Sequence, residues 1–383
     1  MLRYLVKRFL TGLILLFIYV SVLFFAVQLI LPGDYVSQFV LGMTQQESQQ
    51  LRQQLGLDLP IWQRYFIWLS NLVRGNLGTS YSSWGQGPPV SEVIAQTLPV
   101  TLLIFGVGTI LAFVIGRWLG KVAAWRGPGL VSGSITFASI ALYTSFPPWL
   151  AFLIIYFAVW RLNIPISMQG RPSFDAPKNS QAMVMTKMLL GLGLAFLLIF
   201  ALNWLFRRWR RRPLADIVVF ILILVFWSLS WFGFGIWEQI PGILRQISLP
   251  ILTFVLLSFG EVMLIMRTSM MDTLHEDYVQ TARAKGLSSR RVRDEHAART
   301  ALMPVTSRLM ISLPFLLSGM VMIEEVMNIQ GIGTTLFYAV GMQNIPLALG
   351  ATIVIGVVSL LARLLLDVMQ ASLDPRIRIT SRP

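Results

Sequence analysis

Long uninterrupted runs of apolar residues alternate with short polar segments along the whole chain. Each run approaches the roughly 20 residues that an α-helix needs to cross a hydrocarbon core. The pattern predicts an all-α polytopic membrane helical bundle with about eight spans, of which the fourth and fifth are divided only by a short basic segment. The spans are expected at Phe9–Leu31, Leu98–Leu119, Ile135–Trp160, Met188–Phe206, Ile217–Trp237, Leu249–Met266, Met303–Ile323 and Leu347–Met369.

Composition supports a membrane protein. Hydrophobic residues make up 55% of the chain and charged residues 13%, and the mean hydropathy is +0.69, whereas soluble domains carry more charge and shorter apolar runs. The first run is too long for a signal-peptide core and has no small-residue cleavage site, so we interpret it as a retained helix. The absence of cysteine excludes disulfides and thiolate chemistry. Two histidines are too few for a histidine-rich metal site, so no metal site is predicted.

The net charge of +14 raises the question of nucleic-acid binding. The basic residues, however, lie in short segments between apolar runs, which is typical of residues that fix membrane orientation rather than of a nucleic-acid surface. Most of them fall on the side of the N-terminus, which predicts cytoplasmic N- and C-termini. The arginine-rich segment 207–212 could also bind anionic membrane lipids. The basic segments on that side are residues 1–8, 117–126, 207–212, 267–308 and 363–382.

The predicted spans divide the chain into three parts. Residues 1–31 form an N-terminal transmembrane helix, 32–97 an external segment, and 98–383 the core, with an extra helix pair at about 186–237. The external segment contains a glutamine-rich stretch, Gln45–Gln54, expected to be an exposed helix. The aromatic stretch Trp62–Trp68 suits either a membrane interface or a small packed cap.

The cytoplasmic loop at about 267–299 has an amphipathic pattern. Leu274, Tyr278 and Ala282 are spaced four apart and should share one helical face. Gly286 is placed to end that helix in a left-handed cap, and Ser288 or Ser289 can begin a second helix. A solvated loop that only fixes topology would explain the arginines. It would not explain the small residues here, which suit a surface that packs into a partner.

This loop, Tyr278-Val279-Gln280-Thr281-Ala282-Arg283-Ala284-Lys285-Gly286-Leu287, resembles the EAA loop of ABC importer permeases of the dipeptide/oligopeptide/nickel family. The generic Glu-Ala-Ala falls on Gln280-Thr281-Ala282, so only its last alanine and the later glycine are kept. The resemblance extends to both ends of the chain. Its other segments are Leu31-Pro32-Gly33-Asp34, the stretch 55–65, Glu324 with Gly331-Ile332-Gly333, and Asp374-Pro375-Arg376-Ile377-Arg378.

The resemblance implies a type I importer fold with six family-like spans, to which the pair at about 186–237 would be added. It implies a permease subunit that forms half of a pathway for di- or oligopeptides or a related small solute in the bacterial inner membrane. The implied partners are a homologous second permease, two cytoplasmic ATPases that bind ATP and Mg²⁺, and an external solute-binding protein. The chain itself would be no enzyme and hold no cofactor. The ATPase-coupling residues carried over are Glu276, Asp277, Tyr278, Thr281, Ala282, Arg283, Ala284, Lys285, Gly286 and Leu287.

Two carboxylates are candidates for the pathway or its gate. Glu261 lies inside a predicted span, where a carboxylate is costly and either lines a pathway or pairs within the bundle. The resemblance favours a structural or gating role for Glu324, with direct solute contact as the alternative. The segment Gly116–Val122 is one residue short of a phosphate-binding loop and lacks its Ser or Thr, so no nucleotide site is expected. A self-sufficient secondary transporter is the alternative function, although no inverted repeat of the loop is visible.

Overall fold

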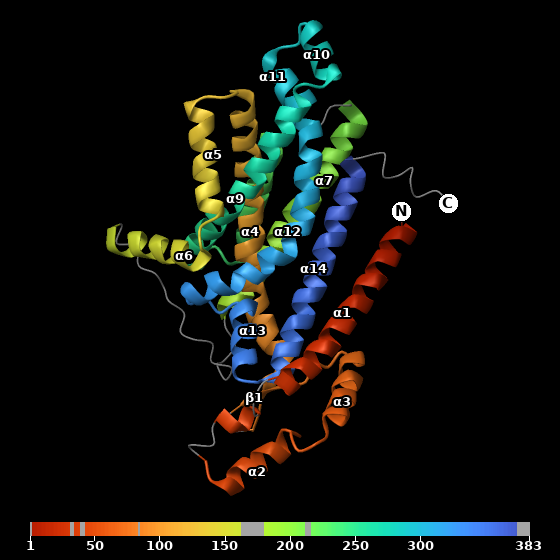
Figure 1. Cartoon of the computed structure of the whole chain (residues 1–383), viewed down its shortest axis with the longest axis vertical. Helices are drawn as coiled ribbons and strands as arrows, with labels where there is room; N and C mark the ends of the chain where they lie inside the picture. The colour runs from red at the N-terminus through yellow and green to blue at the C-terminus, as the bar shows by residue number, and fades with distance from the viewer. Residues whose placement is uncertain are drawn as a thin grey trace.

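A computed structural model describes the backbone of residues 2–30, 34–38, 43–82, 85–161, 180–210 and 216–373. Side chains are described over the same ranges, except at residues 2–8, 30, 38, 85, 180, 204, 206–210, 216–217, 308–320 and 365–373. The described chain is an elongated helical bundle (Figure 1). One end carries the short helix α10 (Asp277–Ala284). The other carries the antiparallel pair β1 (Thr79–Ser82) and β2 (Gly85–Pro89).

Two long helices, α4 (Val90–Trp125) and α9 (Ile240–Thr273), pack along each other in the centre. Small residues recur at every fourth position of α4 on the buried side: Gly108, Ala112, Gly116 and Gly120. A Cβ added at Gly116 would lie 2.6 Å from the Phe259 carbonyl oxygen, and one at Gly120 would lie 2.7 Å from that of Met263. The small side chains therefore let the two backbones approach closely, as in other membrane bundles. The Gly116–Val122 segment lies within this helix.

The remaining core helices surround this pair. Helix α12 (Ala298–Val326) packs against α9, and α14 (Ile345–Leu373) packs against α1 (Leu2–Ile30), α12 and the short α13 (Ile332–Gly341). Within the described residues, five helices are long and apolar enough to cross a membrane, and a bent pair would make a sixth. The run predicted at Met303–Ile323 lies in α12, whose side chains at 308–320 are outside the described residues. The prediction of an all-α membrane bundle is confirmed.

The third predicted span is wrong as one continuous helix. Residues Ile135–Trp160 belong to α5 (Leu130–Tyr143) and to α6 (Pro147–Tyr156), which a π-helical turn, η3 (Phe157–Arg161), extends. The helix axis bends by 105° between the two segments. Pro147 and Pro148 cause the break, because proline has no N–H to bond the preceding turn and its ring excludes a continued helix. Figure 1 shows α6 lying across the long axis and projecting sideways from the bundle.

Two helices lie where the sequence predicted an added pair, α7 (Ser180–Arg210) and α8 (Asp216–Gly233). Helix α7 packs against α4 and places Val184, Met185 and Met188 in the largest buried cluster. The indole N–H of Trp227 on α8 donates to the Met188 carbonyl at 2.8 Å. The part of α8 whose side chains are described, Val218–Gly233, is apolar but shorter than a full membrane span. The proposed lipid contacts of the arginine run 207–212 lie outside the described side chains.

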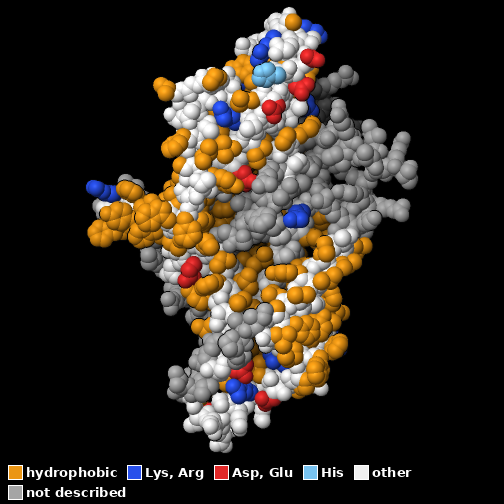
Figure 2. Space-filling view, viewed as in Figure 1, with side chains coloured by type: hydrophobic (Ala, Val, Ile, Leu, Met, Phe, Trp, Pro, Cys, Tyr) orange, Lys and Arg blue, Asp and Glu red, His pale blue; other side chains and the backbone are white. Residues whose placement is uncertain are grey.

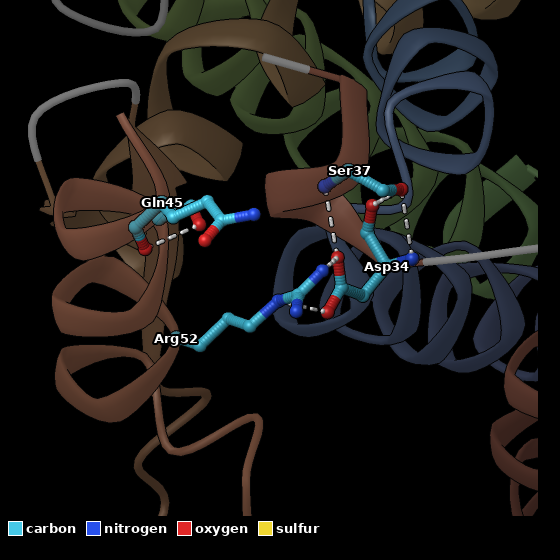
Figure 3. Close-up of polar contacts among 5 residues, drawn as sticks. Asp34, Ser37, Gln45 and Arg52 are labelled. Carbon is cyan, nitrogen blue, oxygen red and sulfur yellow. Dashed lines mark hydrogen bonds and ion pairs between the residues drawn. The ribbon is translucent and has the colours of Figure 1, made fainter. Parts of the chain in front are cut away.

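The end opposite α10 is a small cap of η1 (Tyr35–Gln38), α2 (Gln45–Gln54) and α3 (Ile61–Val73). Helix α2 has the predicted bounds, and Thr44 with Glu47 forms a capping box at its start. Figure 3 shows the link between η1 and α2, where the Arg52 Nε lies 2.9 Å from the Asp34 carboxylate. From α3, Tyr65 and Trp68 pack on Phe24 of α1. Two aromatic side chains of the stretch therefore pack on α1, whereas Trp62 and Phe66 of the same stretch are exposed.

The surface has the polarity of a membrane protein. On the visible face, the described side chains in the middle are mostly hydrophobic with a few charged ones among them, and charged side chains are more frequent toward the two ends (Figure 2). The beginning of α1 and the end of α14 both lie toward the α10 half of the bundle (Figure 1). Both helices therefore run along the bundle between this half and the end that carries the cap.

Candidate functional site

The coupling segment predicted from the sequence forms a helical elbow, by which we mean residues 274–291. Helix α9 ends at Thr273, α10 runs from Asp277 to Ala284, and the short α11 (Ser289–Arg291) follows. Gly286 between them has a φ of +72°, so the predicted left-handed glycine is confirmed. The Gly286 N–H donates to the Arg283 carbonyl at 2.9 Å and the Leu287 N–H to the Ala282 carbonyl at 3.3 Å. These bonds turn the chain sharply at the end of α10.

The elbow is fixed to its own subunit by a small apolar core. Val279 is fully buried and Ala282 is 5% exposed. They pack with Met266 and Met270 of α9 and with Ala124 at the end of α4. The following segment, a π-helical turn η4 (Val292–Ala297), adds Val292 to the same cluster. A displacement of α10 would therefore be transmitted directly to the ends of α4 and α9.

This burial corrects part of the sequence prediction. Leu274 lies in the turn before α10, so it does not form one helical face with Tyr278 and Ala282 as predicted. The side of α10 that packs on the subunit consists of Val279 and Ala282. Tyr278 is 42% exposed, and its hydroxyl donates to the Thr300 Oγ1 at 2.9 Å. Ala282 and Leu287 turn inward. The other predicted coupling residues are exposed: Glu276, Asp277, Tyr278, Thr281, Arg283, Ala284, Lys285 and Gly286.

Polar contacts strengthen the junction of α4 with the elbow and with η4. The Arg283 guanidinium lies over the Trp125 ring at 5.8 Å from its centroid, within the range of a cation–π contact. The Lys121 Nζ lies 3.0 Å from the Asp294 Oδ1, and the Arg293 guanidinium donates to both oxygens of the same carboxylate. The hydrogen bonds from Arg293, with a smaller contribution from Lys121, lower the pKa of Asp294 to about 2. Asp294 is therefore ionised at every physiological pH.

Glu324 forms a second junction, at the far end of α12. Its side chain is fully buried. One carboxylate oxygen accepts from the Thr101 hydroxyl of α4, and the other accepts from the Thr334 N–H in the first turn of α13 at 2.9 Å. Thr101 in turn accepts from the Ile332 N–H at 2.9 Å. The carboxylate thus caps the N-terminus of α13 from a neighbouring helix, where negative charge is favoured.

Gly331 and Gly333 are required by this arrangement. A Cβ added at Gly331 would overlap the Glu324 carboxylate, and one at Gly333 would lie 2.9 Å from its Oε2. The Gly331-Ile332-Gly333 segment is therefore the partner of Glu324 in space as well as in the sequence pattern. Because the side chain has no exposure in this conformation, the geometry favours a structural or gating role for Glu324 over direct solute contact.

Glu261 is a half-buried residue near the middle of α9, one residue after Gly260. A Cβ added at Gly260 would lie 2.5 Å from the Ser139 carbonyl oxygen and 2.9 Å from the Tyr143 Cβ of α5. Glu261 therefore lies at the level of the α5–α6 break. The elbow follows the end of the same helix, about 20 Å further along its axis. Within the described residues, no group of three or more His, Asp or Glu side chains could hold a metal ion.

Two features escaped the sequence reasoning. Asn344 between α13 and α14 is buried, and its side-chain amide pairs with both backbone groups of Tyr81 in β1, each at 3.1 Å. No local pattern indicates this contact, because the partners are 263 positions apart. The buried stripe of small residues on α4 was visible as a four-residue repeat of Gly and Ala, a recognised signal for close helix packing.

Comparison with known proteins agrees with this architecture. Residues 206–379 match the family described as "Binding-protein-dependent transport system inner membrane component". Residues 1–104 match the N-terminal family described as "Binding-prot-dependent transport system membrane comp, N-term". The two matches include the first helix, the elbow and the Glu324 junction.

Curated relatives span the chain from end to end. A Brucella suis biovar 1 protein whose name describes a peptide permease is 31% identical over 383 residues, covering 99% of this chain and 100% of that protein. The dipeptide transport system permease protein DppB of Lactococcus lactis subsp. cremoris is 29% identical over 379 residues, covering 99% and 100%. The glutathione transport system permease protein GsiC of Escherichia coli O6:H1 is 29% identical over 381 residues, covering 99% of each chain. The chain belongs to the family of inner membrane permease components of binding-protein-dependent transport systems.

Proposed function

We propose that this chain forms half of the translocation pathway of an ATP-driven importer for di- or oligopeptides or a related small solute. The names of its relatives, which include dipeptide and glutathione permeases, support this solute class. Its partners are a homologous second permease, two cytoplasmic ATPases that bind ATP and Mg²⁺, and an external solute-binding protein. The chain itself needs no cofactor. It lies in the bacterial inner membrane with the elbow and both termini in the cytoplasm.

The observation that carries this proposal is the burial of one side of α10 and the exposure of the other. Its inner face is fixed to α4 and α9 through Val279 and Ala282, while Tyr278, Arg283 and Lys285 remain exposed at the tip of the bundle. A helix that packs on its own subunit with one side and exposes the other side to the cytoplasm can be displaced by a bound partner protein. In this mechanism, ATP-driven closure of the ATPases displaces α10, and the ends of α4, α9 and α12 move with it.

Glu261 and Glu324 have different roles in this mechanism. Glu261 lines the pathway near the middle of the membrane, at the level where α5 is interrupted. Glu324 holds the outer ends of α4, α12 and α13 together, so that they move as one unit when the pathway opens outward. The exposed charges of α10 determine whether the ATPases dock, whereas the two carboxylates act after docking.

The proposal is tested with the complete four-component complex in proteoliposomes. The double variant Lys285→Glu, Arg290→Glu reverses two exposed charges of the elbow and should abolish co-purification of the ATPases and ATP-dependent peptide uptake. The matched control reverses two exposed charges far from the elbow, Arg74→Glu after α3 and Arg245→Glu near the start of α9, and should leave the ATPases bound. Peptide uptake by the purified chain alone, driven by an ion gradient without ATP, would overturn the proposal in favour of a secondary transporter.

A further inference from the structure

The segment that joins the elbow to α12 holds one residue more than an α-helix would place there. Helical backbone is continuous from α11 through η4 into α12. At the start of η4, the Val292 N–H donates to the Ser288 carbonyl, four residues before it. At its end, the Ala298 N–H donates to the Arg293 carbonyl, five residues before it. The π-helical turn therefore contains one surplus residue within an otherwise α-helical segment.

The burial of side chains on both sides of η4 indicates the effect of the surplus residue. Val292 at its start and Ala301 beyond its end are both fully buried, in the cluster that contains Met266 of α9. The two positions are nine residues apart, about two and a half α-helical turns, and would lie on opposite sides of a regular α-helix. One surplus residue corresponds to about 100° of helical rotation. It turns Val292 from the outer side toward the core that Ala301 faces.

Packing, rather than the local sequence, maintains this turn. Residues 288–303 contain no glycine or proline and are rich in Arg and Ala, which favour the α-helix. Pro304 disturbs the helix at the Thr300 carbonyl, four residues before it, and this carbonyl lies beyond η4. A regular α-helix is therefore favourable for the backbone but would turn Val292 out of the core. The segment thus has two competing arrangements.

The turn also lies where the mechanical parts of the subunit meet. Helix α10 packs on η4, and the chain from α10 to α12 passes through it. From within η4, the Asp294 carboxylate holds Lys121 of α4 at 3.0 Å, whereas Glu295 forms an exposed ion pair with Arg291 at 2.9 Å. A change of helical register in η4 would therefore change the orientation of the elbow relative to α12.

We propose that η4 is the joint at which the elbow turns relative to α12 when the ATPases close. During this motion the surplus residue is redistributed, so that Val292 leaves the core while Ala301 and the rest of α12 keep their packing. The rotation available is about 100°, the contribution of one residue, and register shifts of this kind are a known form of switching. The inference rests on the proposed importer function and deepens it, because it names the joint through which α10 acts on α12.

The first test deletes Glu295 in the complete complex. The deletion removes the surplus residue and leaves eight residues between positions 292 and 301, a little over two α-helical turns, so a regular α-helix can keep both side chains inward. The elbow therefore keeps its place, the ATPases should still co-purify, and the thermal midpoint should equal or exceed that of the parent. Peptide uptake per ATP hydrolysed should nevertheless fall at least about fivefold, because the joint cannot turn.

Glu295→Ala is the matched control, because it removes the same exposed ion pair with Arg291 but keeps the number of residues. It should leave uptake per ATP unchanged. Normal uptake per ATP in the deletion variant would overturn the joint. A lower midpoint or loss of the ATPases in that variant would also overturn it, because Glu295 would then not be surplus. Uptake by the parent complex without ATP would instead contradict the importer function, whatever the deletion does.

The second test follows Val292 directly. The chain contains no cysteine, so Val292→Cys gives a single thiol in this subunit, and its modification is measured on this chain. A small water-soluble thiol reagent should react at least about fivefold faster while the complex hydrolyses ATP than without ATP, because the turn exposes the thiol. Ala301→Cys, equally buried but beyond the joint, is the control and should stay slow. An unchanged rate at Val292→Cys, or an equal increase at Ala301→Cys, would overturn the proposal.

Discussion

The elbow and the Glu324 junction depend on glycine for opposite reasons. At the elbow, Gly286 has a φ of +72° and nothing within 4 Å of an added Cβ, so its backbone conformation requires glycine. At the outer junction, Gly331 has a φ of −103°, which any residue adopts, but an added Cβ would overlap the Glu324 carboxylate. One end of the subunit is an open turn and the other is a filled polar core. This difference suits an exposed contact for a motor at one end and a fixed unit at the other.

The largest expected effect is at Gly331. The Gly331→Ala variant places a methyl group on the Glu324 carboxylate and must displace either Glu324 or the start of α13. We expect a loss of about 2–3 kcal/mol in folding stability, as is typical for overpacking a filled site, and a clear fall in the thermal midpoint of the purified complex. Gly341→Ala at the end of α13, where nothing lies within 4 Å, is the control and should be nearly neutral. Equal midpoints for the two variants would contradict a filled outer junction.

The charge of Glu324 gives the next effect. Glu324→Gln keeps the shape but replaces one acceptor of the carboxylate by a donor, so Thr101 and the Thr334 N–H can no longer both donate to it. Leaving one buried polar group unpaired costs about 1–2 kcal/mol. Glu325→Gln is the neighbouring control, because Glu325 is exposed and accepts from the Tyr338 hydroxyl. Thermal midpoints of the two variants should differ, with the Glu324 variant lower.

Gly286 should affect coupling more than stability. Gly286→Val forces a β-branched residue into the left-handed region at a cost of about 1–2 kcal/mol, and reorients the exposed end of α10. We expect the complex to assemble while peptide uptake per ATP hydrolysed falls several-fold. Gly127→Val is a close control, because Gly127 also has a positive φ, +68°, and nothing within 4 Å. If both variants transport equally well, the elbow has no special role in coupling.

The smallest effect concerns the ion pairs of Asp294. Asp294→Asn weakens its contacts with Lys121 and Arg293, but these groups are partly exposed, so the loss should be under about 1 kcal/mol. Because the folded-state pKa of about 2 lies below the ordinary value of an aspartate, this contribution is complete above about pH 5 and is lost only as the pH falls toward 2. The stability difference between variant and parent should therefore be constant between pH 6 and 8, measured as thermal midpoints.

The sequence predicted local features better than contacts between distant segments. The bounds of α2 and the left-handed Gly286 follow from polar periodicity and glycine placement, which are local signals. The inner face was assigned wrongly because α9 ends at Thr273 and α10 begins only at Asp277, so Leu274 does not share a helix with Tyr278, and Val279 packs inward instead. The α5–α6 break was missed because hydropathy stays high across it, although the two prolines marked it. The partners of Glu324 could not be predicted, since Thr101 lies 223 positions away.

The central claim is that the exposed side of α10 contacts a cytoplasmic ATPase, and single-cysteine cross-linking tests it most directly. Lys285→Cys in the assembled complex should cross-link to an ATPase subunit through a short thiol–amine reagent. An impermeant maleimide should reach it only after cells are opened. Gln49→Cys on α2 should react with the same maleimide in intact cells and should not cross-link to an ATPase. A Lys285→Cys thiol that reacts from outside intact cells, or that forms no ATPase cross-link in an actively transporting complex, would contradict the account.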